Sequence, residues 1–185
     1  WKPLYNVLEY SGLNAMVVNA QHMKAVPGRK TDVKDAEWIA DLLQHGLLKA
    51  SYIPSKDQRE LRELVRYRKS LIEDKGRELN RLQKMLEGAN IKLSGTVSSI
   101  DGKSARKILD FIVNGEKFTG EKYDEMYGKN EISHNLKASK EQILADLKGF
   151  LSPLQRRMMK ELLAHLDELN EHIKNLNDEI DNFMK

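Results

Sequence analysis

The segment VPGRKTDVKDAEWIADLL, residues 26–43, decides how the rest of this chain is interpreted. Pro27 and Gly28 are a strong turn signal, and the helical spacing that follows predicts a helix that starts near Asp32. Asp32 and Asp35 stand three residues apart at this start. Residues at that spacing on a helix have Cβ atoms about 5–6 Å apart, so both carboxylates would face the same side.

Two interpretations of the aspartate pair stay open. In the first, Thr31 or Asp32 caps the helix and Asp35 interacts with the positive end of the helix dipole. In the second, both carboxylates bind a divalent cation such as Mg²⁺, which prefers hard oxygen ligands and retains waters for substrate phosphates. Three basic residues near the pair suit a phosphodiester, or simply solvate the loop: Arg29, Lys30 and Lys34.

The composition favours long solvated helices over a compact globule. Of the 185 residues, 40% are hydrophobic and 32% are charged, with only four Phe and two Trp. The absence of cysteine fits a reducing compartment such as the cytoplasm, and no apolar run is long enough to cross a bilayer. No leader of the basic-then-apolar type opens the chain. Because it begins at Trp1 and not at Met, we interpret it as a piece of a larger protein.

The first 54 residues show a short α/β pattern. Residues 1–12 are typical of a helix end closed by Gly12, and the apolar run Ala15–Val18 predicts a short buried strand. KASYIP, which ends at Pro54, predicts a second extended piece. The helix between them has a predicted apolar face made of Ala36, Ile39, Ala40, Leu42 and Leu43. This pattern is too short for a whole α/β domain.

Two long helices are predicted to form an antiparallel coiled coil, either within one chain or between chains. Residues 55–93 carry a row spaced by seven, which polar residues weaken in the middle: Val65, Ile72, Leu79 and Leu86. Residues 152–185 carry two such rows: Met159, Leu166, Ile173 and Ile180, and Leu162, Leu169, Leu176 and Phe183. The first helix has a surplus of basic residues and the second a surplus of acidic ones, which favours their pairing. Residues 94–151 are predicted to be a helical insert or connector.

One face of the first long helix is basic at helical spacing, through Arg59, Arg62, Arg66 and Lys69. Three interpretations stay open for this face. It is a solvated surface, a ridge that contacts the phosphates of DNA or a guide RNA, or a set of ion pairs with the acidic last helix.

Several stretches of the chain closely resemble the transposases of bacterial insertion-sequence family one-ten, which are DEDD transposases that act as RNA-guided recombinases. The resemblance is found in three segments: WKPLYNVLE, VVNAQHMKAVPGRKTDVKDAEWIADLLQHGLLKASYIP and LRELVRYRKSLIEDKGRELNRLQKMLEGANIKLS. The resemblance runs to about residue 100, and GRKTDVKDAEWIADLL is close to a family signature.

The resemblance implies an RNase H-like fold of the Holliday-junction-resolvase type, with an acidic tetrad that binds Mg²⁺. The last two acids of the tetrad fall on Asp32 and Asp35. The family's first aspartate and its glutamate lie before the segment that matches WKP, and its serine nucleophile lies in a later domain, so none of the three is expected here. The chain would thus hold the second half of the catalytic domain (1–54), coiled-coil helices (55–93 and 152–185) and the insert (94–151).

The resemblance therefore implies part of a DNA transposase from the bacterial cytoplasm, inactive alone. Its expected partners are DNA, a guide RNA and further copies of itself, with no membrane. The alternative is a non-catalytic helical module that oligomerises and binds nucleic acid.

Overall fold

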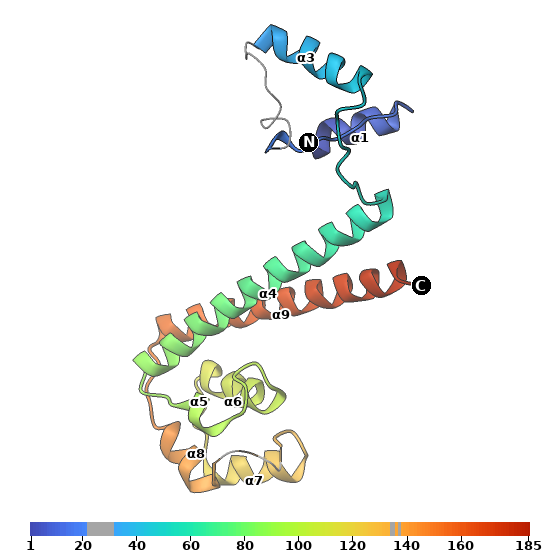
Figure 1. The fold of residues 1–185 in the computed structure, drawn as a ribbon. Coiled ribbons are helices and arrows are strands. Elements are labelled where there is room, and N and C mark those ends of the chain that lie inside the picture. The colour runs from blue at the N-terminus through green and yellow to red at the C-terminus, as the bar shows by residue number, and fades with distance from the viewer. Residues whose placement is uncertain (22–31, 134–135, 137) are drawn as a thin grey trace. The chain divides into compact units, whose positions relative to one another are not determined.

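The computed structural model describes residues 1–21, 32–133, 136 and 138–185, with side chains described from residue 35 onward in the second range. The chain divides into two compact units, Trp1–Arg59 (unit 1) and Glu60–Lys185 (unit 2). Both are built from helices (Figure 1), which confirms the prediction of a mostly helical protein. Among the described helices, none combines the length and apolar character that crossing a bilayer demands.

The two described helices that lie wholly in unit 1 end as the sequence predicts. They are α1 (Lys2–Tyr10) and α3 (Asp32–Gln44), followed by Gly12 and Gly46. These glycines have φ angles of 71° and 66°, in the left-handed region that a residue without a Cβ adopts at little cost. The amide after each glycine donates at 2.9 Å to a carbonyl near the helix end, which closes the last turn.

The two extended segments of unit 1 meet, but they do not form a buried strand. Val18 and Ala50 make an isolated antiparallel bridge, and the Ser51 amide donates to the Val17 carbonyl at 2.7 Å. Met16 is 51% exposed, so the prediction that Ala15–Val18 is a buried strand is wrong. A strand is buried when sheet neighbours and helices cover it, and the described part of unit 1 supplies only this one bridge.

The predicted apolar face of α3 is mostly exposed. Leu42 is 5% exposed, but Ile39 is 39% and Leu43 is 52% exposed, and both alanines of that face are exposed. Within the described residues, only Leu42 of this face is buried. No described element of unit 1 covers the rest of it.

Unit 2 consists of two long helices and a small group of short ones. The long helices are α4 (Lys56–Gly88), whose first residues belong to unit 1, and α9 (Pro153–Phe183). Between them lie four short helices, which we call the helical insert: α5 (Leu93–Thr96), α6 (Lys103–Asn114), α7 (Gly120–Gly128) and α8 (Lys140–Asp146). A reciprocal pair of hydrogen bonds between Ser152 and Gln155 caps the start of α9.

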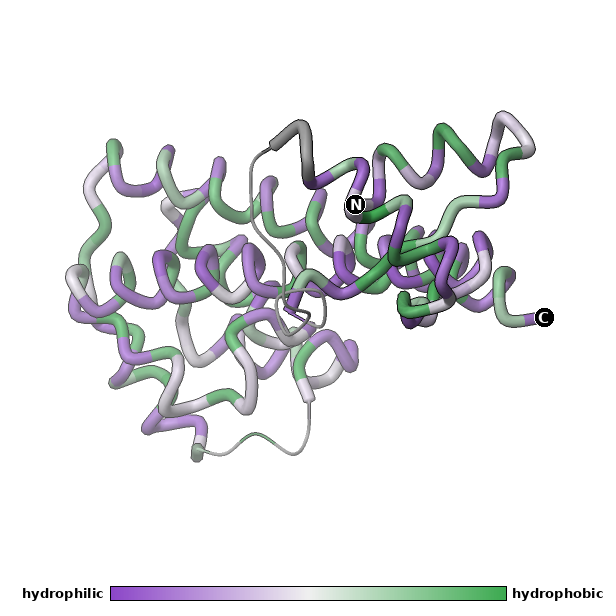
Figure 2. Tube along the Cα trace, turned by 45° about the horizontal axis from the view of Figure 1, so that its top comes forward, coloured by the Kyte–Doolittle hydropathy of each residue, from purple (hydrophilic) through white to green (hydrophobic). Residues whose placement is uncertain are grey.

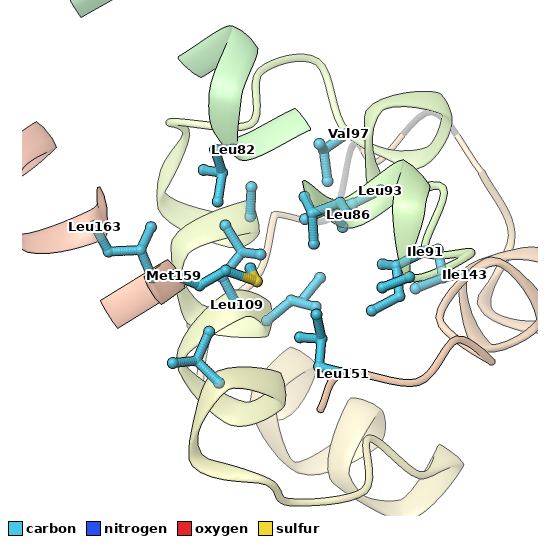
Figure 3. Packing of buried hydrophobic residues seen from close by; sticks show 14 of the residues in the cluster. Leu82, Leu86, Ile91, Leu93, Val97, Leu109, Ile143, Leu151, Met159 and Leu163 are labelled. Atoms are coloured by element: carbon cyan, nitrogen blue, oxygen red, sulfur yellow. The ribbon is translucent and has the colours of Figure 1, made fainter. Parts of the chain in front are cut away.

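The insert packs on one end of the long helices around a shared apolar core (Figure 3). Leu82 and Leu86 of α4 meet Met159 of α9, and Leu109 of α6 fills the space between them. Leu93, Met126 and Ile143 bring in other helices of the insert, and each is at most 1% exposed. The low aromatic content therefore does not prevent a compact core, because Leu, Ile and Met side chains fill it.

The long helices run antiparallel where they meet. Glu78 of α4 lies beside His165 of α9, and Arg68, further towards the start of α4, donates to Asn177, further towards the end of α9. Figure 2 shows apolar and polar residues alternating along these helices, as expected for helices with one packed face.

The row of α4 that faces inward is not the one predicted. Leu71 and Leu82 are buried, whereas Val65 is 46% and Ile72 is 41% exposed. The end of the predicted row is buried or partly buried because the insert covers a second side of α4 there: Leu79 and Leu86 contact the core. Nothing described in unit 2 covers that side nearer the start of the helix.

On α9 the predicted rows are buried only in the first half. Met159, Leu166 and Leu169 are at most 5% exposed, while Phe183 is 38% exposed. Leu163, which is outside both rows, is buried, because the insert contacts α9 from another side.

Candidate functional site

The aspartate pair belongs to the first turn of α3, which begins at Asp32 as expected. Asp35 is half-buried and lies on the inner face of the helix with Trp38 and Leu42, at spacings of three and four residues. The side chain of Asp32 lies outside the described residues. So do Arg29, Lys30, the Lys34 side chain and the Thr31 cap.

In the described part of the chain, no three His, Cys, Asp or Glu side chains come together as a metal-binding group. Asp35 therefore has no pair of further acidic or histidine ligands beside it among the described residues. An ion at this position would depend on Asp32 and on oxygen ligands from other molecules or segments.

The surface around α1 and α3 is strongly apolar. On α1, Leu4 is 67% and Val7 is 62% exposed, and on α3 Leu43 is 52% exposed. The only buried residues described in unit 1 are Leu42, Pro54 and Arg59. Much of the apolar surface of α1 and α3 is therefore uncovered within the described residues.

Arg59 does not belong to the exposed basic face on which the sequence places it. Its guanidinium is buried in unit 1, where it donates to the Glu9 carboxylate and, at 2.8 Å, to the Pro54 carbonyl. The guanidinium also lies over the Tyr5 ring, 5.3 Å from its centroid. The periodicity of α4 alone could not reveal this, because Glu9 is 50 positions away. We therefore exclude Arg59 from the predicted basic face.

The other three residues of the basic face are exposed on α4. Arg62 and Arg66 make no ion pair with the described residues, and Lys69 lies 3.9 Å from Glu73 in a pair exposed on both sides. Such a pair is weak and leaves the ammonium group accessible. We define Arg62, Arg66 and Lys69 as the basic ridge.

Among the described residues, Arg62, Arg66 and Lys69 form no ion pair with α9, so the third interpretation of the basic face finds no support. The polar contacts that involve α9 and α4 use other residues. Arg68 hydrogen-bonds to Asn177, and Lys75 lies 2.6 Å from Asp101, which Asn170 of α9 also contacts. These polar residues interrupt the apolar contact between the long helices. None of them uses the basic ridge.

In a comparison with protein families, residues 1–91 match the model of a transposase family. The model is the one described as DEDD_Tnp_IS110, the DEDD transposases of the IS110 type. The match covers unit 1 and α4 and ends before the helical insert. No curated protein and no solved structure matched the chain.

Proposed function

We propose that this chain is part of a DNA transposase, and that unit 1 supplies one side of its catalytic centre. The observation that carries the proposal is the family match over residues 1–91, which includes the two aspartates in the first turn of α3. As an enzyme, the whole protein would cleave and rejoin DNA strands during the transposition of an insertion sequence.

Asp32 and Asp35 would hold Mg²⁺ in this proposal. Their carboxylates are the hard oxygen ligands that Mg²⁺ prefers, and the first turn of a helix presents residues three apart on the same side. When bound, the ion would neutralise charge that develops on the scissile phosphate. The two aspartates are half of the expected tetrad, so this chain alone should be inactive.

The exposed apolar surface of unit 1 supports the view that the catalytic domain is larger than unit 1. An RNase H-like domain surrounds its sheet with helices, and the uncovered faces of α1 and α3 are where further elements would pack. In the same proposal the acids that complete the tetrad come from those elements, and the serine nucleophile comes from a later domain.

Substitution of Asp35 tests the catalytic proposal most simply. In the complete protein, we expect Asp35→Asn to abolish recombination and to leave the melting temperature unchanged, because the change removes a charge and keeps the shape. Asp41→Asn is the matched control, since Asp41 is an exposed acid on the same helix. Recombination by Asp35→Asn at the rate of the control would refute the assignment.

The basic ridge would contact the phosphates of DNA or of a guide RNA. Replacing Arg62, Arg66 and Lys69 together with Gln should weaken duplex binding and flatten its salt dependence by about 0.9 for each phosphate that the variant no longer neutralises. The control replaces three lysines of α9 and the residues after it with Gln: Lys160, Lys174 and Lys185, all of which are exposed. An equal decrease of the slope in both variants would mean that only net charge matters and would remove the ridge from the proposal.

A second candidate is a helical module that oligomerises and binds nucleic acid without catalysis. It is favoured by one observation: unit 2 has its own apolar core, whose buried members all lie between Leu82 and Leu166. The two candidates differ in the Asp35→Asn experiment, because the non-catalytic module predicts no change in the function of the whole protein.

A further inference from the structure

Unit 2 contains a pocket of about 630 Å³ that neither the aspartates nor the basic ridge touches. It lies between the end of α6, the start of α7, the end of α8 and the segment before α9. Its volume is in the range of small-molecule sites, which run from about 300 to 1,000 Å³. Apolar side chains such as Ile112, Leu144 and Leu151 line it, so a ligand would find an apolar surface there.

Three cations line the pocket against a single acid. Lys117, Lys148 and Arg156 face the charge of Glu116 alone, and none of the three cations makes an ion pair with the described residues. The Nε atom of Arg156 is buried and has no acceptor among those residues. A buried donor without an acceptor is costly. The three cations against one acid also give the pocket wall a net positive charge, which favours an anionic ligand.

The Arg156 guanidinium lies against the backbone at the end of α6. Its Nη1 atom occupies the space that a Cβ atom would need at Gly115. Gly115 ends α6 with a φ angle of 85°, which also favours glycine. The bare backbone of the α6 end therefore lets the guanidinium lie against it at the pocket wall.

An exposed phenylalanine stands at the same pocket on a fixed backbone. Phe150 lines the pocket and is 74% exposed, yet its amide donates to the Ala89 carbonyl at 3.0 Å. The preceding residue, Gly149, passes so close to that carbonyl that no Cβ would fit. A large apolar ring held in solvent at a cationic pocket suits stacking on a flat, charged ligand.

We propose that this pocket binds an unpaired nucleotide of a single-stranded nucleic acid. The base stacks on Phe150 and the apolar wall, and Lys117, Lys148 and Arg156 contact the phosphate. The combination of a stacking ring with adjacent cations is the one that single-stranded nucleic-acid sites use. A duplex does not fit, because its bases are stacked inside and cannot enter a pocket. The inference rests on the proposed function only in taking nucleic acid as the partner.

Binding of short labelled oligothymidylate and oligouridylate to the whole chain, measured by fluorescence anisotropy, tests the proposal. Phe150→Ala should weaken binding at least about fivefold, the effect of removing one stacking platform. Lys117→Gln with Lys148→Gln should reduce the salt slope by about 0.7 for each phosphate that is no longer neutralised. Lys174→Gln is the lysine control, and Phe150→Trp should retain binding because it keeps a stacking ring.

Photo-crosslinking with a 5-iodouridine oligonucleotide provides the second readout. We expect the crosslink in the peptide that contains Phe150, in the unsubstituted chain and in the variant without the basic ridge. Unchanged affinity in Phe150→Ala, or crosslinks only outside the pocket, would overturn the inference. Competition by inorganic phosphate as strong as that by thymidine monophosphate would also overturn it, in favour of a simple anion site. A preference for the DNA or the RNA oligomer identifies the source of the strand. Asp41→Asn should leave all these readouts unchanged, and recombination by Asp35→Asn tests the proposed function separately.

Discussion

At the scale of single residues, local spacing predicted features that depend on neighbours in sequence, such as the start of a helix. It missed contacts between residues that are far apart in sequence. The helix that starts at Asp32 follows from Pro27-Gly28 and the apolar residues after it, and the structure confirms it. The position of Arg59 depends on Glu9 in another helix, which no periodicity encodes. The predicted basic face therefore included one residue, Arg59, that does not belong to it.

The Arg59–Glu9 pair gives a prediction at this scale. Glu9→Gln should lower the free energy of unfolding by about 1–3 kcal/mol, because a buried guanidinium loses its counter-charge while Glu9 itself is partly exposed. Glu37→Gln is the control, since Glu37 is an exposed acid on α3. Urea denaturation measures both variants. Equal midpoints for the two would show that Arg59 needs no partner.

At the scale of elements, heptad spacing predicted where the long helices lie but not which residues they bury. The spacing assumes one partner along the whole helix, whereas α4 has α9 on one side and the insert on another at one end only. Residues at the same heptad position therefore differ: Leu86 is 1% exposed and Val65 is 46% exposed. The insert itself could not be placed from sequence, because its short helices pack through contacts between distant segments.

This difference along α4 is testable by truncation. Leu82→Ala should cost about 2–5 kcal/mol of unfolding free energy, because it leaves a cavity in the core of unit 2. Tyr67→Ala removes a side chain of α4 that is 57% exposed, and we expect it to stay within about 0.5 kcal/mol of the unsubstituted chain. Chemical denaturation followed by circular dichroism measures both. Similar costs would contradict this burial pattern.

At the scale of the whole molecule, the two units differ in how much of their own apolar surface they bury. Unit 2 buries a continuous core, whereas unit 1 leaves most large side chains of α1 and α3 exposed. The sequence predicted an incomplete catalytic domain through its resemblance to a family. It did not predict the core of unit 2, because a low aromatic content says little about how Leu, Ile and Met pack.

Association between copies is the prediction at this scale. We expect the chain to form a dimer through the uncovered side of α4, where Val65 and Ile72 are exposed on a helix. Val65→Lys with Ile72→Lys should give a monomer in light scattering and keep the helical content. Leu169→Asp with Leu176→Asp is a poorer test, because Leu169 is buried within unit 2 and its replacement would unfold the chain. A monomer at tens of micromolar for the unsubstituted chain would refute the dimer.

The central claim is that the aspartates at the start of α3 hold the metal ion of a DNA-cleaving centre. The most direct measurement is strand cleavage by the complete protein with Asp35→Cys, in Mg²⁺ and in Mn²⁺. A thiolate is a poor ligand for Mg²⁺ and a better one for Mn²⁺. We predict cleavage that is abolished in Mg²⁺ and partly restored in Mn²⁺, whereas cleavage in Mg²⁺ at the unsubstituted rate would contradict the account.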